Sequence, residues 1–87
     1  MKVRQGFVIR DVGGEKYAVA TGEAAKHFRG MLKLNEVGAA MFGLFNEETT
    51  AEEVAKKMTE EYDVEYDVVK KDVDEFVAKL KEADILE

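Results

Sequence analysis

The sequence lacks cysteine, proline and tryptophan altogether, and it contains no serine. Without cysteine, the chain cannot form disulfides, a cysteine-ligated zinc site or an iron–sulfur cluster. Without a serine or cysteine nucleophile, and with His27 as its single histidine, it cannot assemble a catalytic triad. A catalyst built from this chain would depend on carboxylates, lysines, arginines, threonines or tyrosines alone. We therefore expect a protein that is not an enzyme and that holds no metal and no cofactor.

Long apolar runs are also absent. The longest stretch without charge or strong polarity covers nine residues, from Val37 to Phe45, whereas a membrane-spanning helix needs about 20. The first six residues, Met1 to Gly6, are charged and lack the apolar segment of a secretion signal. The sequence therefore predicts a soluble, cytoplasmic protein that does not associate with membranes.

What the chain does contain is typical of one globular domain over residues 1–87. Of its 87 residues, 46% are apolar and 37% are charged, which is enough apolar material for a modest core. The net charge of −6 is uneven: residues 1–34 carry seven Lys/Arg and three acids (net +4), and residues 35–87 carry six Lys/Arg and sixteen acids (net −10). The acidic part is unsuited to nucleic acid, whereas the basic part favours an acidic partner.

The first part of the chain has the pattern of β-strands. Two β-prone runs, 7–10 and 17–21, flank a Gly-Gly pair, which is typical of a hairpin turn because both residues can adopt φ > 0. After a polar connector over residues 22–29, the run 30–34 alternates, with Leu32 and Leu34 on one face and Met31 and Lys33 on the other. These features predict a three-stranded antiparallel sheet whose last strand is an edge.

From Asn35 onwards the apolar spacing is helical. Asn35 is a suitable N-cap for a first helix, and Thr50 and Glu53 have the spacing of a capping box for a second. A third helix is expected to begin near Tyr66 or Asp67. The predicted class is therefore α+β, a three-stranded antiparallel sheet followed by three helices that cover one of its faces. The side chains expected to face inward are, helix by helix, Val37, Met41, Leu44 and Phe45; Val54, Met58 and Tyr62; and Val69, Val73, Phe76, Val77 and Leu80.

Residues that could carry chemistry have plainer explanations. Paired carboxylates such as those at 60–61 lie on polar helix faces among lysines, which is typical of a solvated surface rather than of an acid–base site. His27 has no nearby histidine or cysteine in the sequence and is expected at the surface. Gly38 and Gly43, inside the first helix, indicate close packing against a neighbouring element.

The predicted third strand is the feature that points most directly to a function. Its run 30–34 has Lys33 as its only charge, and long exposed edges are normally covered or blunted. An open edge beside an apolar helix row can accept an extended peptide as a fourth strand. The alternative is that Lys33 and the connector protect the edge. Such an edge can also pair with a second copy, so the chain is expected as a monomer or a weak or swapped dimer.

The order of these motifs resembles one family. The Gly-Gly hairpin, the run Gly30 to Asn35, the segment Thr50 to Val54 and the run Asp72 to Phe76 follow one another as in the PqqD family, over a span from Phe7 to Leu86. The resemblance implies a winged helix-turn-helix-like RiPP recognition element. Such domains bind the leader segment of a ribosomally made precursor peptide and present it to a modifying enzyme, often a radical SAM protein. Family members often carry a tryptophan, a glycine and a proline at positions where this chain does not, which puts a role in quinone synthesis itself in doubt.

The resemblance also implies where the leader would bind. It would add to the third strand, in the groove beside the third helix. We expect the apolar walls at Val73 and Val77, and attraction of acidic leader residues by Arg29, Lys33 and Lys70. The leader is expected to be extended and amphipathic, with acidic residues beside one or two large apolar anchors. The full set of expected peptide-binding residues is Arg29, Met31, Leu32, Lys33, Leu34, Tyr66, Lys70, Val73 and Val77.

A DNA-binding regulator is the alternative function, because winged helices also bind DNA. The net charge of −6, with −10 on the helical part, argues against it because a phosphate backbone would be repelled.

Overall fold

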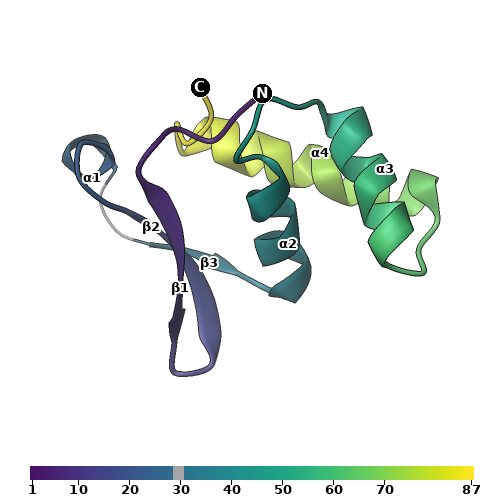
Figure 1. Cartoon of the computed structure of the whole chain (residues 1–87), viewed down its shortest axis with the longest axis horizontal. Helices are drawn as coiled ribbons and strands as arrows, with labels where there is room; N and C mark the ends of the chain where they lie inside the picture. The colour runs from purple at the N-terminus through teal and green to yellow at the C-terminus, as the bar shows by residue number, and fades with distance from the viewer. Residues whose placement is uncertain (29–30) are drawn as a thin grey trace.

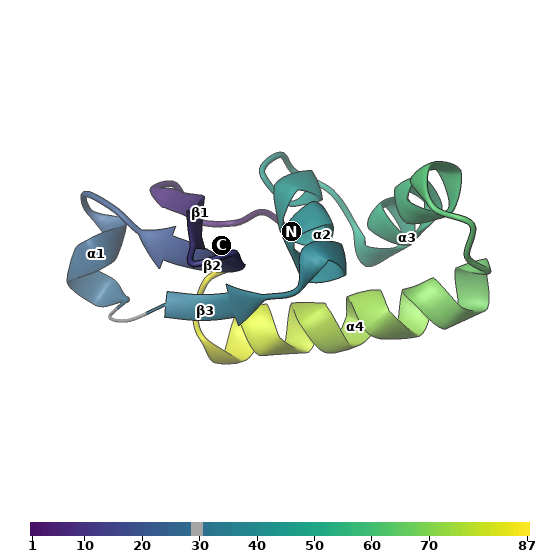
Figure 2. The ribbon, with the colours of Figure 1, turned by 90° about the horizontal axis from the view of Figure 1, so that it is seen from below.

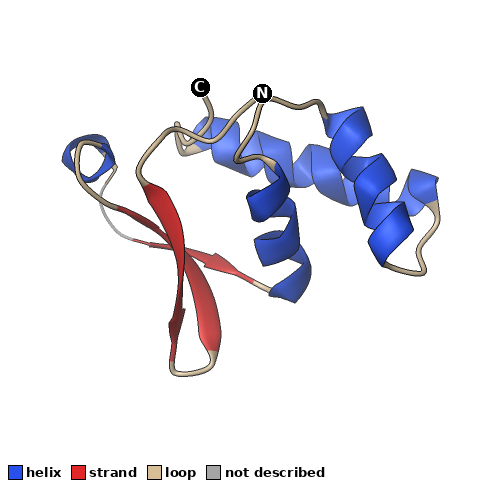
Figure 3. Ribbon diagram, in the orientation of Figure 1, coloured by secondary structure: helices blue, strands red, loops and turns tan. Residues whose placement is uncertain are grey.

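The structure, a computed structural model, describes residues 1–28 and 31–87. Within these ranges it contains a three-stranded antiparallel sheet and four helices (Figures 1 and 3), which confirms the α+β class and is compatible with a winged helix-turn-helix arrangement. Arg29 and Gly30, the first a predicted site residue and the second the predicted start of the third strand, lie outside the described residues. In chain order the elements are β1 (Phe7–Val12), β2 (Glu15–Ala20), α1 (Ala24–His27), β3 (Met31–Leu34), α2 (Glu36–Leu44), α3 (Ala51–Glu61) and α4 (Tyr66–Glu82).

The β1–β2 hairpin closes on the predicted Gly-Gly turn. Gly13 and Gly14 have φ of +60° and +84°, a combination that residues with a side chain rarely adopt. Both strands reach the turn directly, because Val12 pairs with Glu15, so each extends further towards the turn than its predicted run. The strand order is β1-β2-β3, and the tip of the hairpin projects away from the helices (Figure 1).

The connector between β2 and β3 contains the short helix α1, which the sequence pattern did not predict. Four residues are too few to show an amphipathic period, and no side chain caps the helix. Phe28, which follows it, packs edge-to-face on Phe7 of β1, with 5.3 Å between the ring centroids. This aromatic pair attaches α1 to the end of the molecule farthest from α3 (Figure 1).

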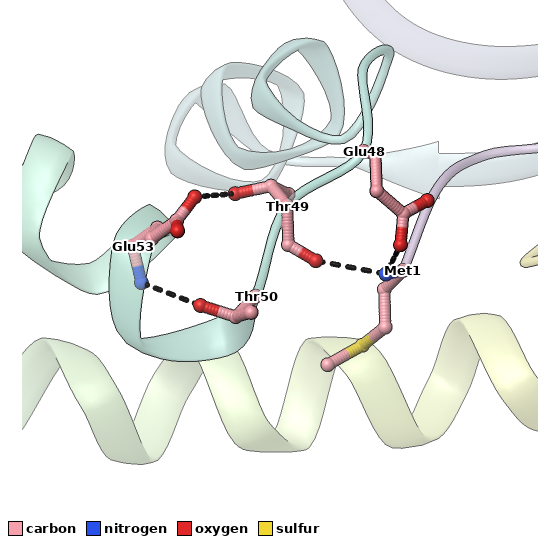
Figure 4. Close-up of polar contacts among 5 residues, drawn as sticks. All are labelled: Met1, Glu48, Thr49, Thr50 and Glu53. Carbon is pink, nitrogen blue, oxygen red and sulfur yellow. Dashed lines mark hydrogen bonds and ion pairs between the residues drawn. The ribbon is translucent and has the colours of Figure 1, made fainter.

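The two predicted helix starts differ in detail. At the start of α2, the Asn35 side chain accepts a hydrogen bond from the Gly38 N–H at 2.7 Å, so the predicted N-cap is confirmed. At the start of α3, Thr50 caps the Glu53 N–H at 3.1 Å. The reciprocal bond of a capping box does not form, because the Glu53 carboxylate instead accepts from the Thr49 hydroxyl at 3.0 Å (Figure 4).

The two ends of the described chain are fastened to the helical part and to each other. The Met1 amine donates to Glu48 Oε1 at 2.7 Å and to the Thr49 carbonyl at 2.8 Å, which ties the α2–α3 loop to the N-terminal segment (Figure 4). Val3 and Leu86 form an isolated β-bridge. The termini therefore lie close together (Figure 1).

The core lies between the inner face of the sheet and helices α2, α3 and α4. Two side chains expected to face inward, Val37 and Tyr62, are instead 42% exposed. Tyr62 is the C-cap of α3, just after its last turn, whereas Val37 lines the cavity described below. None of the described helices combines the length and the apolar character that crossing a bilayer requires. The buried apolar residues are Val3, Phe7, Ala18, Leu34, Met41, Phe42, Phe45, Ala51, Val54, Ala55, Met58, Val69, Val73, Val77, Leu80, Ile85 and Leu86.

Candidate functional site

The backbone of β3 has one side paired and one side free within the described residues. In an antiparallel ladder, pairs of opposite residues alternate between hydrogen-bonded and non-hydrogen-bonded. The Thr21 N–H donates to the Gly6 carbonyl at 2.7 Å, so this pair is a hydrogen-bonded one, and every second pair along the β1–β2 ladder is hydrogen-bonded in the same way. The β2 residues between these pairs, which include Ala18, therefore direct their backbone N–H and C=O groups away from β1 and towards β3.

It follows which β3 groups face outward. Leu32 and Leu34 lie opposite Ala18 and Lys16 and direct their backbone groups towards β2. The N–H and C=O groups of Met31 and Lys33 therefore point away from the sheet, and no described strand pairs with them. The open edge predicted from the sequence is confirmed for the described part of β3, and it offers two donors and two acceptors.

A groove runs from this edge to the space between α2 and α4. Figure 2 shows β3 and α4 on the same side of the molecule. The narrow end of the groove, about 80 Å³, lies against β3, and its wide end, about 320 Å³, lies between α2 and α4. Four residues, Asn35, Gly38, Phe76 and Lys79, line both ends. The narrow end is completed by Leu32, Lys33 and Leu34, and the wide end by Val37, Met41, Asp72 and Glu75.

Gly38 forms the meeting point of α2, β3 and α4. A Cβ atom there would lie 3.2 Å from Asn35 Oδ1 and 3.7 Å from both a Leu34 methyl and a Phe76 ring carbon. The close packing predicted for Gly38 is confirmed, and it brings α2 close to the groove. The same prediction for Gly43 is wrong, because within the described residues a Cβ there would meet no atom within 4 Å apart from its chain neighbours and the backbone of α2 itself.

The face of α4 that lines the groove differs from the face that the sequence pattern favoured. Asp72, Glu75, Phe76 and Lys79 recur at helical spacing along one flank of the buried stripe. Lys70 lies on the opposite flank: six residues before Phe76, at about 100° per residue, it projects about 120° away. It forms an ion pair with Asp74 at 2.9 Å, and this hydrogen bond raises the pKa of Lys70, with a smaller contribution from Glu52 of α3.

The other three predicted α4 residues also lie away from the groove. Val73 is fully buried and Val77 is buried, so both side chains belong to the core and line neither end of the groove. Tyr66 is exposed in the first turn of α4, ten residues before Phe76 and so about 15 Å along the helix. Hydrophobic periodicity identifies the stripe that packs against the rest of the protein, whereas the groove is lined by the flank of that stripe. Phe76, which the pattern placed in the core, is only partly buried. As a large apolar residue at the edge of the stripe, it was the one sequence feature that could have indicated the flank that lines the groove.

The predicted strand residues divide between the two faces of the sheet. Leu34 is buried and Leu32 is partly buried, whereas Met31 is 56% exposed and Lys33 is exposed. This alternation is as predicted. A peptide along the edge of β3 would therefore place alternate side chains towards the groove and towards the outer face.

A polar cluster fixes the charge of Lys33 on the outer face. Its ammonium lies 3.0 Å from Glu15, whose carboxylate also accepts from the Tyr17 hydroxyl at 2.9 Å. The hydrogen bond from Lys33, supplemented by that from Tyr17, lowers the pKa of Glu15, and the same bond raises the pKa of Lys33. Among the described residues no group of three or more His or carboxylate side chains is placed to hold a metal ion.

A second cavity, of about 400 Å³, lies between the N-terminal segment, α1 and the C-terminal residues. Although it is larger than either end of the groove, none of its lining residues belongs to β3. Its charged walls include Arg4 and Asp84, which already form an ion pair at 2.8 Å. The groove is the better candidate because a free strand edge and a cavity meet there.

The fold and the groove define a small α+β domain in which an unpaired strand edge adjoins a helix-lined cavity. Comparison with protein families then identifies it: residues 13–86 match the family described as Coenzyme PQQ synthesis protein D (PqqD), and the chain belongs to this family. This confirms the resemblance seen in the sequence. No curated protein matches the chain.

One solved structure is similar over the whole chain. It is that of TbiB1 in complex with the TbiA(beta) leader peptide. The TM-score is 0.73 with 23% sequence identity, and the match covers 100% of this chain and 95% of that one. At this identity the likeness shows a shared fold.

Proposed function

We propose that this chain binds the leader segment of a ribosomally made precursor peptide and presents it to a peptide-modifying enzyme, as a binding protein rather than a catalyst. The observation that carries the proposal is the free edge of β3, with the backbone groups of Met31 and Lys33 pointing away from the sheet beside the groove. Membership of the PqqD family and the likeness to a protein solved with a leader peptide support it.

Strand addition alone gives little net affinity. Four backbone hydrogen bonds contribute about 2–6 kcal/mol at roughly 0.5–1.5 kcal/mol each, whereas ordering a flexible peptide costs about 2–5 kcal/mol. The two terms nearly cancel. Affinity and choice of peptide must therefore come from side chains in the groove, where Phe76 supplies the exposed apolar surface next to β3.

The structure changes which residues are proposed to contact the leader. Met31, Leu32, Lys33 and Leu34 remain, because they form the edge strand. On α4 we replace Tyr66, Lys70, Val73 and Val77 with Phe76 and Lys79, which line the groove. Lys33 belongs to the edge strand and Lys79 lines the groove beside it, so acidic leader residues are expected beside β3.

The test is proton–nitrogen NMR of the full chain titrated with synthetic leader peptides from short precursor reading frames that neighbour its gene. We expect shift changes confined to residues 31–38 and 72–79. A scrambled peptide of the same composition is the control. Changes centred on the second cavity, around Arg4 and Phe28, would contradict the assignment of the site.

The enzyme that receives the peptide is proposed to be a radical SAM or another peptide-modifying enzyme. Co-purification of the enzyme encoded beside this chain, with and without leader peptide, tests this part of the proposal. An enzyme that modifies its precursor equally fast without this chain would contradict it.

A further inference from the structure

We infer that the wide end of the groove, between α2 and α4, receives a long cationic side chain of the bound peptide, lysine or arginine. The inference rests on the proposed function and adds a chemical requirement to it. It also reverses, at this end of the groove, the sign of the charge expected for the leader, for which the sequence predicts acidic residues beside apolar anchors.

The wide end combines an apolar wall with a carboxylate rim. Val37, Met41 and Phe76 form the wall, and Asp72 and Glu75, one helical turn apart on α4, form the rim. Lysine and arginine have long aliphatic stems that cover apolar surface while the charged head reaches polar groups. The head can pair with one or both carboxylates and can approach the face of the Phe76 ring. A cavity of about 320 Å³ has room for such a side chain.

The carboxylates of the rim are available. Neither Asp72 nor Glu75 takes part in any ion pair among the described residues, and both are exposed. Lys79 follows Glu75 by one turn but also lines the narrow end at β3. The lining of the narrow end therefore contains two ammonium groups, Lys33 and Lys79, and no carboxylate, whereas that of the wide end contains two carboxylates, Asp72 and Glu75, and one ammonium, Lys79.

Two features oppose a cation at this position, the ammonium of Lys79, which also lines the wide end, and the N-terminus of α2. The wide end includes the first turn of α2, and a helix N-terminus carries a partial positive charge. Two residues reduce this effect: Asn35 already accepts from the Gly38 N–H, and Glu36 places a full negative charge in the first turn. At the wide end itself, the two carboxylates of Asp72 and Glu75 exceed the single ammonium of Lys79, so the charged side chains of its lining sum to −1.

Selection from a random library tests the inference whatever the sequence of the natural precursor. A displayed library of random twelve-residue peptides is selected on the full chain and on the double variant Asp72→Lys/Glu75→Lys. A second double variant, Glu60→Lys/Glu61→Lys, makes the same change in net charge on exposed residues of α3 that do not line the groove. Circular dichroism checks that all three proteins are folded.

We expect peptides selected on the native chain to carry lysine or arginine beside an apolar residue. This preference is lost on the Asp72/Glu75 variant and retained on the Glu60/Glu61 variant. For the best peptide, replacing the cationic residue by glutamate weakens binding to the native chain about tenfold, through lost attraction and new repulsion at a partly exposed pair, and does not weaken binding to the groove variant.

The other outcomes overturn the inference in distinguishable ways. Selected peptides without a cationic preference refute it but leave peptide binding intact. A preference lost equally on both variants shows attraction to the net negative charge of the molecule and refutes the site. If selection enriches no peptide, or if the enriched peptides bind equally well when β3 is blocked by Met31→Pro, the proposed function itself fails.

Discussion

Each edge of the sheet has an outward backbone N–H that a single substitution can remove. The N–H of Met31 faces outward at the β3 edge, and by the same alternation the N–H of Ile9 faces outward at the β1 edge. Proline removes an N–H and is tolerated at such outward edge positions.

We therefore expect Met31→Pro to weaken leader binding at least fivefold, because it removes one backbone bond of about 1 kcal/mol and disturbs its neighbours. Ile9→Pro, the matched control at the other edge, is expected to leave binding unchanged. Isothermal titration calorimetry measures both. Equal losses in the two variants would contradict strand addition at β3.

Phe76 and Val73 separate ligand contact from core packing. Phe76→Ala removes an apolar wall of the groove and is expected to reduce leader affinity about tenfold or more. Val73 has no exposed surface, so Val73→Ala is expected to lower the free energy of unfolding by about 2 kcal/mol while the leader affinity of the folded protein hardly changes. Urea unfolding and peptide titration of each variant provide the measurements. If Val73→Ala reduced the affinity for the leader as strongly as Phe76→Ala, Val73 would have to be a wall of the groove after all.

At the scale of elements, the Glu15–Lys33 ion pair links β2 to β3. The directions of the two pKa shifts define how its contribution to the stability of the fold changes with pH. The pKa of Glu15 is lowered, so its stabilising effect is present above the usual value of 4.5 and is lost as the pH falls through the lowered value. The pKa of Lys33 is raised, so its effect is present below 10.5 and is lost as the pH rises through the raised value.

Glu15→Gln is therefore expected to lower the urea midpoint at pH 7 and to lower it less at pH 3. The effect is small because both groups are exposed. Glu47→Gln, in the exposed α2–α3 loop, is the control and is expected to show no such difference. An equal effect of Glu15→Gln at both pH values would show that the carboxylate charge plays no part.

The sequence predicted most elements because each has a strong local signal. The Gly-Gly turn defines the hairpin, and Asn35 and Thr50 mark the starts of α2 and α3. Helix α1 has no such signal, because it is a single turn held by the Phe7–Phe28 contact. The edge of β3 followed from strand order. The α4 half of the site did not, because periodicity identifies the buried stripe but not which flank of it faces β3.

At the scale of the whole molecule, the distribution of charge bears on the alternative function. The helical part carries −10, and its longest helix, α4, contains five acids and four lysines. We expect no mobility shift of random or genomic duplex DNA at low salt and micromolar protein. A salt-dependent shift would favour the DNA-binding alternative.

The projecting tip of the β1–β2 hairpin offers a practical way to follow these reactions. Val12 is 53% exposed beside the turn, two strands away from the β3 edge, and the native chain has no thiol of its own. A single Val12→Cys substitution would therefore accept one fluorophore at one defined place. Resonance energy transfer from that dye to a labelled leader would then report docking in real time, and the dye itself would lie clear of the docked strand.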